Sequence, residues 1–197
     1  NYTFHERAKY HGLHVGATKR MANGFQFGAT YLLSKNEDTA STPNNPFDID
    51  ADYGRSSQDQ RHRFTANWGV RLRYAFNFNG IFYAASGQAI GETTGGIEIN
   101  GDVSTGADRP TCGLDPRFNP GCTVLGLAAG QIVPRNPLRS EPVARFDVRV
   151  SRTFPLRNVR IEPLFEVFNL FNRQNNDPGA YQTSLANARF GQAGRSS

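Results

Sequence analysis

The fold is decided by the stretch LHVGATKRMANGFQFGATYLLSK, residues 13–35. Apolar side chains occupy alternate positions on both sides of its centre, as at Leu13 and Val15 in the first half and Phe27 and Tyr31 in the second. A period of two is typical of β-strands with one apolar and one polar face. Between the halves lies Asn23-Gly24, a pair that tolerates the positive φ of a tight turn. The stretch therefore predicts a long amphipathic β-hairpin.

Four further segments show the same alternation. The first two meet near residues 71–73, where the parity of the apolar positions changes, which predicts a second hairpin with a tight turn. Tyr74 is assigned to the apolar face after this turn, and Phe154 to the apolar face of the next strand. The predicted strands after the opening hairpin are 59–72, 74–82, 145–154 and 160–171, and Pro155-Leu156-Arg157-Asn158 is predicted to join the last two.

The connections between these strands alternate between short and long. Segments rich in Gly, Pro, Asn, Asp, Ser and Thr predict long loops near 36–58, 87–142 and 172–189. In an up-and-down antiparallel sheet, alternate connections emerge at opposite ends, so all the long loops lie at one end. Strands of about 9 to 12 residues with this asymmetry are typical of an outer-membrane β-barrel. We therefore expect an all-β, antiparallel transmembrane barrel whose apolar face contacts outer-membrane lipid, with a soluble β-sandwich binding module as the alternative.

Composition excludes several other classes of protein. No run of about 18 apolar residues exists, so a transmembrane helix is excluded. The net charge of +5 comes from 22 Lys and Arg against 17 Asp and Glu, scattered along the chain, and we expect no nucleic-acid binding. No nucleophile elbow, phosphate loop or Cys-x-x-Cys motif occurs, so we expect neither catalysis nor a cofactor. Cys112 and Cys122 lie in one long loop, and they predict a disulfide if the compartment is oxidising.

Several motifs occur in the same order as in a known family. Taken together, the chain resembles the C-terminal barrel region of TonB-dependent receptors, and within them the Oar-like subgroup with a carboxypeptidase-regulatory-like N-terminal domain. The motifs that carry the resemblance are YHGL (10–13), KR (19–20), NGF (23–25), YLLSK (31–35), DYG (52–54), DQRHRF (59–64), DRP (108–110), RTFPL (152–156) and EVFNLFNR (166–173).

The resemblance implies a barrel of about 22 strands that is closed by an N-terminal plug and energised by TonB. Residues 1–197 would then be a partial C-terminal barrel domain with about six of these strands, located in the bacterial outer membrane. The chain begins at Asn1 without Met or a signal segment, and we interpret it as an internal part of a longer protein. Its expected function is uptake of a bulky siderophore, oligosaccharide or peptide, and the alternative is a non-transporting barrel with a structural or adhesive role.

Two sets of residues are candidate sites. Carboxylates at alternate positions, with one more some residues later, have the oxygen-ligand pattern of a weak calcium loop, and a solvated acidic loop is the alternative. The calcium candidates are Asp48, Asp50, Asp52 and Asp59. Polar residues on the strands would face the barrel lumen, where they could dock the plug or pair across strands. These lumen-facing candidates are Asn67, Arg71, Asp147, Arg149, Glu162 and Glu166.

Overall fold

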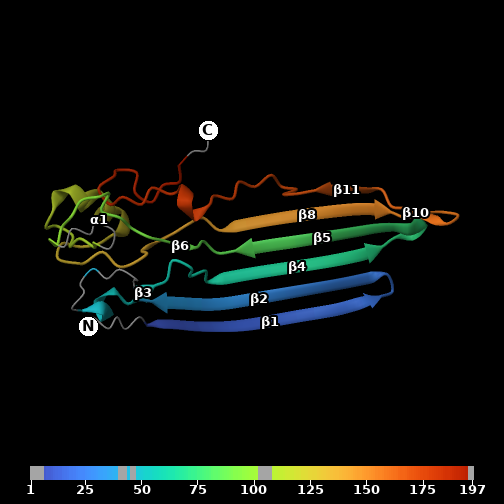
Figure 1. Cartoon of the computed structure of the whole chain (residues 1–197), viewed down its shortest axis with the longest axis horizontal. Coiled ribbons are helices and arrows are strands. Elements are labelled where there is room, and N and C mark those ends of the chain that lie inside the picture. Colours follow the sequence, from blue (N-terminus) through green and yellow to red (C-terminus); the bar gives the residue numbers. More distant parts are fainter. Residues whose placement is uncertain (1–6, 40–43, 45–47, 102–107, 195–197) are drawn as a thin grey trace.

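The chain forms one layer of long antiparallel strands with its loops gathered at one end (Figure 1). The computed structural model describes residues 7–39, 44, 48–101 and 108–194. The strands of the main sheet follow the order β1-β2-β4-β5-β8-β11, with β3 beside β2, and β1 and β11 form its edges. Their bounds are β1 Ala8–Ala22, β2 Phe25–Asp38, β3 Gly54–Arg55, β4 His62–Arg71, β5 Phe76–Ala85, β8 Val143–Arg152 and β11 Leu164–Val167.

The opening hairpin is confirmed and is longer than the alternating stretch alone indicates. β1 pairs with β2 from Ala8↔Asp38 to Ala22↔Phe25. Asn23 and Gly24 both have positive φ, 54° and 76°, as a two-residue turn of the type favoured in hairpins requires. The turn lies at the end of the sheet away from the long loops (Figure 1).

Strand register brings apolar side chains of neighbouring strands in the main sheet onto one face. Tyr31 lies opposite Val15 on one side and Phe64 on the other, and farther along the sheet Phe82 lies opposite Phe146. These side chains are exposed: Leu13 shows 58% of its surface and Val15 54%. Exposed apolar area costs about 25 cal/mol per Å² in water, so the face requires an apolar surrounding.

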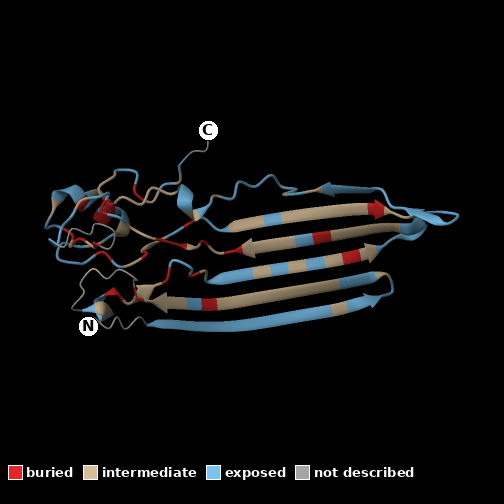
Figure 2. Ribbon diagram, viewed as in Figure 1, coloured by how far each residue is buried: buried red, intermediate tan, exposed pale blue. Residues whose placement is uncertain are grey.

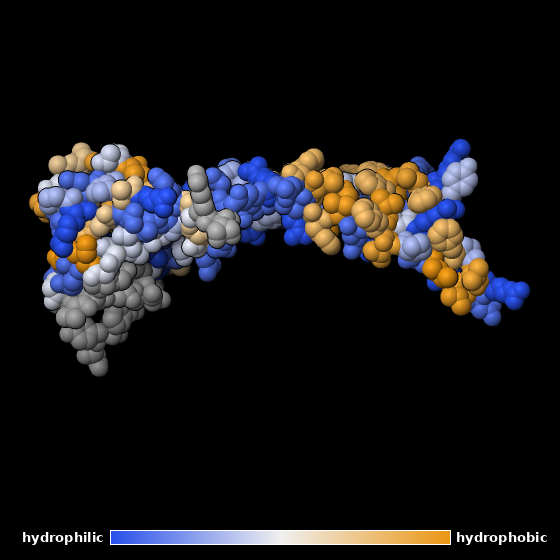
Figure 3. Space-filling view, turned by 90° about the horizontal axis from the view of Figure 1, so that it is seen from above, coloured by the Kyte–Doolittle hydropathy of each residue, from blue (hydrophilic) through white to orange (hydrophobic). Residues whose placement is uncertain are grey.

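This apolar face has the height of a membrane span. Figure 3, which views the sheet along its edge, shows an orange band across the half of the molecule farther from the loops, with hydrophilic residues nearer to the loops. On β2 the band runs from Phe25 to Leu33. At a rise of about 3.3 Å per residue this is about 26 Å along the strand, close to the apolar band of about 25 Å that outer-membrane barrels carry.

The hydrophobic core of the chain lies in its loops instead of under its sheet. Segments 48–59, 87–101, 108–142 and 172–194, called the loop head here, fold together at one end of the strands, and Figure 2 shows the buried residues concentrated there. The core consists of Cys112, Phe118, Cys122, Val133, Leu185 and Phe190. Of the buried apolar residues among those described, the long strands contribute Ala85 alone. The loop head is thus a folded unit.

Short elements give the loop head its shape. β6 pairs with β7 and so joins the two ends of the longest loop. The one α-helix in the described part of the chain, α1, is too short and too polar to cross a membrane. The bounds of these elements are η1 Ile49–Asp52, β6 Ala89–Ile90, η3 Pro116–Phe118, α1 Asn119–Leu125, β7 Leu138–Arg139 and η4 Pro178–Ala180.

Three strand predictions were wrong at the turn end of the sheet. Tyr74 lies in the turn between β4 and β5, with φ 61°, and not on the apolar face. Phe154 leaves the main sheet and begins β9 (Phe154–Leu156), which pairs with β10 (Val159–Ile161). The predicted strand 160–171 is divided, because Pro163 has no N–H to donate and Asn169 takes a positive φ of 51° after β11. Periodicity alone did not reveal these breaks.

Candidate functional site

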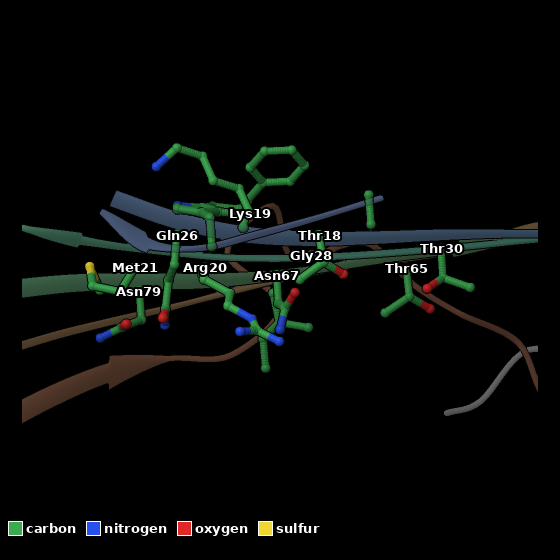
Figure 4. Close-up of a pocket in the computed structure, with 15 residues that line it drawn as sticks. Thr18, Lys19, Arg20, Met21, Gln26, Gly28, Thr30, Thr65, Asn67 and Asn79 are labelled. Atoms are coloured by element: carbon green, nitrogen blue, oxygen red, sulfur yellow. The ribbon is translucent and has the colours of Figure 1, made fainter. Parts of the chain in front are cut away.

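The face opposite the apolar band is polar and is called the inner face. Figure 4 shows Thr30, Thr65 and Asn67 pointing to this side of the strands, whereas Lys19 points to the other. The residues form cross-strand rows, as in Thr18↔Gly28 and Gly28↔Asn67. A hollow of about 910 Å³ lies between β1, β2, β4 and β5, lined by Gly28 and Thr30 and by longer side chains such as Arg20 and Gln26. The inner face could therefore accommodate another polypeptide segment or a hydrated ligand.

Gly28 leaves space for a neighbouring side chain in this hollow. A Cβ at Gly28 would lie 2.5 Å from Oδ1 of Asn67, so only glycine allows the Asn67 side chain to lie across the neighbouring strand. This close approach is a reason for glycine inside a strand, where its flexibility otherwise destabilises.

The six lumen-facing candidates all lie on the inner face or at its turn end. Asn67 and Asp147 lie on either side of Ile81 in one cross-strand row, and Arg71 shares a row with Asn77 and Ser151. Nη1 of Arg149 is 3.6 Å from Oε1 of Glu166 across the β8–β11 pair. Ser151 Oγ donates to Glu162 Oε1 at 2.7 Å. Cross-strand charge pairing thus occurs, as one of the two interpretations of these residues anticipates.

Asp147 forms its ion pair with a residue of its own strand and not with a residue of a neighbouring strand. Its carboxylate pairs with Arg145, two residues away on the same face, at 2.7 Å. Its Oδ1 also accepts a hydrogen bond from the backbone N–H of Asn169, 2.8 Å away. Asp147 therefore holds the segment that follows β11 beside β8.

The four calcium candidates are not gathered around one point. Asp52 pairs with Arg109 and Asp59 with Arg139, both carboxylates being almost fully buried. Asp50 lies 3.5 Å from Arg7, and Asp48 accepts from the Ala51 N–H. Arginine side chains and backbone N–H groups thus already contact the buried oxygens of Asp52 and Asp59. Within the described residues, no group of three His, Cys, Asp or Glu side chains has the geometry to hold a metal ion.

Cys112 and Cys122 form a disulfide inside the loop-head core. The bond closes a segment that contains η3 and the first turn of α1, and Phe118 between the two cysteines is fully buried. Backbone hydrogen bonds from Cys112 N–H to Gln131 O and from Gly130 N–H to Cys112 O, each 2.8 Å long, tie the segment to the rest of the loop. The disulfide thus contributes to a defined loop conformation.

Sequence reasoning missed a cleft of about 750 Å³ between the end of β2, β3 and the loop head. Six cationic side chains line this arginine cleft, against two carboxylates. The cations are Lys35, Arg55, Arg61, Arg109, Arg135 and Arg139, and the carboxylates are Glu37 and Asp59. The signal was hidden because these residues come from separate loops, and within each loop acidic residues accompany them in the sequence.

Glu92 stands behind the cleft in the loop head. Its Oε2 accepts a hydrogen bond from the Asn136 N–H at 2.8 Å. Burial raises the pKa of Glu92 to about 7, although the charges of Arg109 and Arg135 and the hydrogen bonds act in the opposite direction. Glu92 therefore changes its charge near neutral pH.

These features define a class of protein. The antiparallel sheet has an exposed apolar outer face, a polar inner face and folded loops at one end. These features are those of a wall segment of an outer-membrane β-barrel. A family model described as "Outer membrane beta barrel domain" matches residues 1–197, and the chain belongs to this family. Its location is accordingly the bacterial outer membrane. Searches of curated proteins and of solved structures gave no match.

Proposed function

We propose that the chain forms part of the wall and outer mouth of a TonB-dependent receptor, which captures a bulky ligand at the cell surface and transports it inward. The observation that carries this proposal is the position of the folded loop head at one end of a long polar inner face. One chain thus combines a surface for ligand capture with the wall of a passage. No catalytic step is part of the proposal.

The shape of the inner face supports a wide barrel. Small barrels fill their interior with side chains from their own strands, whereas barrels of about 22 strands enclose a separate plug. Gly28, Thr30 and Asn67 line a hollow of about 910 Å³ on the inner face, which the side chains of these strands do not fill although Arg20 and Gln26 also line it. The sheet edges at β1 and β11 also need neighbouring strands, because unpaired backbone groups are costly in lipid.

The ordered structure of the loop head supports a role in ligand capture more than a role as a simple cover of the barrel. Its core is buried, its longest loop is closed by β6–β7, and a disulfide joins Cys112 to Cys122. A preorganised surface loses less conformational entropy when it binds a ligand than a flexible one. A siderophore, an oligosaccharide and a peptide all remain candidate cargo classes.

The test is binding to TonB by the intact outer-membrane protein. The protein is extracted in detergent and mixed with the purified periplasmic domain of TonB, and it is also reconstituted in planar bilayers. We expect TonB to be retained by the protein, and we expect no steady conductance, because a plug closes the barrel. An open channel without TonB binding would overturn the proposal in favour of a non-transporting barrel.

A further inference from the structure

The arginine cleft has more positive charge than its carboxylates neutralise. Four of its cations form ion pairs: Arg109 with Asp52, Arg135 with Asp38, Arg139 with Asp59 and Lys35 with Glu37. Within the described residues, Arg55 and Arg61 have no carboxylate within ion-pair distance. Among the described residues, two guanidinium groups of this cleft thus form no direct ion pair, although Asp59 attracts Arg55 from a longer distance.

Arg55 is held in place by the loop head. Its Nη1 donates to the backbone oxygens of Asn136, at 3.2 Å, and Pro137, at 3.5 Å, while Asn136 Nδ2 donates to the Arg55 oxygen at 2.6 Å. Burial and then the charge of Arg139 lower the pKa of Arg55. The protein thus holds a cation where its charge is disfavoured, and an incoming anion would relieve this cost.

Arg61 approaches the cleft from the sheet. Its backbone oxygen accepts a hydrogen bond from the Ser34 N–H at 2.9 Å, which fixes the position of its main chain beside β2. The side chain is exposed and lines the cleft. Arg55 interacts electrostatically with Arg61, Arg139 and Asp59, and Arg139 also forms an ion pair with Asp59.

The cleft also has the size and walls of a ligand site. Its volume of about 750 Å³ lies within the range of about 300–1,000 Å³ for small-molecule pockets. Leu125, Leu127 and Pro134 contribute apolar surface opposite the strands. These walls belong to the loop head, beyond the end of the apolar band, so the cleft suits a dissolved ligand better than a lipid headgroup.

We propose that the arginine cleft binds a soluble polyanion with at least two carboxylate or phosphate groups, and that Arg55 and Arg61 are its main contacts. Guanidinium groups bind both kinds of oxyanion through paired hydrogen bonds. Arg139 supplies a third positive charge, which Asp59 partly neutralises. The inference rests on the proposed function in one respect: the polyanion is the class of cargo that the receptor captures.

The test is calorimetric titration of the intact protein, in detergent free of lipopolysaccharide, with citrate and with pyrophosphate. We expect saturable binding of at least one probe, weakened about 10-fold or more by Arg55→Gln and by Arg61→Gln, since each removes a charge-assisted contact. Arg189→Gln is the matched control, because Arg189 is an exposed arginine of the loop head outside the cleft. We expect it to bind the probes as the wild type does.

Several outcomes would overturn the inference. One is that neither probe binds; another is that Arg61→Gln and Arg189→Gln have the same effect. Binding of lipopolysaccharide by a protein that binds neither soluble probe would assign the cleft to a lipid headgroup instead. Arg61→Gln is the decisive variant if Arg55→Gln disturbs folding, because the Arg61 side chain is exposed. TonB is absent from this assay, so loss of TonB binding would remove the proposed function and leave the polyanion site standing.

Discussion

Asp59 and Arg139 form an ion pair although 80 residues separate them in the chain. Asp59 lies just before β4, and Arg139 is the last residue of β7, so the pair joins two segments of the loop head. Oδ1 of Asp59 also accepts a hydrogen bond from the Asn36 N–H at 2.8 Å. One buried carboxylate therefore connects β2, β4 and the loop head.

Removal of Arg139 is predicted to loosen the loop head. Arg139→Gln leaves the Asp59 carboxylate buried without its counter-charge, which should lower stability by about 3 kcal/mol. The measurement is amide hydrogen exchange of residues 87–142 in the intact protein. Arg117→Gln is the control, because its pair with Asp115 is exposed, and it should leave exchange in the core unchanged. Equal exchange in the two variants would contradict the role of the pair.

Two neighbouring residues on β1 are predicted to differ in how much stability the protein loses when each is replaced by a charged residue. Ala17 lies in the middle of the apolar band, opposite Ala29, whereas Thr18 lies opposite Gly28 on the inner face. Ala17→Arg should cost about 2 to 4 kcal/mol on folding into lipid vesicles, as arginine does near the bilayer midplane. Thr18→Arg should cost much less. Urea titration of folding into vesicles measures both, and equal losses would show that the faces are assigned incorrectly.

Glu92 is predicted to make the loop head less stable as the pH rises. Its pKa of about 7 in the folded protein exceeds its ordinary value of 4.5, so between these values the folded state binds more protons than the unfolded state. The associated stability is present in full below about pH 4.5, declines as pH rises to about 7, and is absent above that. Glu92→Gln should remove this decline and stabilise the loop head at pH 8 by at most about 3 kcal/mol.

Hydrogen-exchange protection factors at pH 5 and pH 8 test this prediction. Glu141→Gln, which removes an exposed carboxylate of the same loop, controls for the loss of one negative charge. A wild-type loop head that is equally protected at both pH values, after correction for intrinsic exchange, would show that Glu92 does not titrate in this range.

The disulfide is predicted to stabilise the loop head without affecting the strands. Cys112 and Cys122 are 10 residues apart. A cross-link of this span lowers the entropy of the unfolded chain and thereby raises the free energy of unfolding by about 3 kcal/mol. Replacing both with Ser should make residues 108–142 sensitive to protease while barrel folding in detergent is retained. Cleavage of the wild type and the double variant at the same rate would contradict this prediction.

The candidate site was predictable where it depends on strand parity and unpredictable where it depends on loops. Asn67, Asp147 and Arg149 share one face because a period of two assigns each side chain to a face without reference to other strands. The interpretation of Asp52 and Asp59 as calcium ligands did not rest on such a period, because both residues lie in a loop. Their partners, Arg109 and Arg139, are 57 and 80 residues away, and no local pattern links them.

The sequence by itself determined the central parts of the long strands, their two faces and the Asn23-Gly24 turn, because alternation and positive φ are local properties. It did not reveal where the strands break at Tyr74, Phe154 and Pro163. Tertiary structure alone decided where the core lies, which arginine meets which carboxylate, and that Arg55 and Arg61 share a cleft. The physical reason is that irregular loops have no period from which contacts can be inferred. Their arrangement depends on burying Phe118, Leu185 and their neighbours together, which joins segments far apart in the chain.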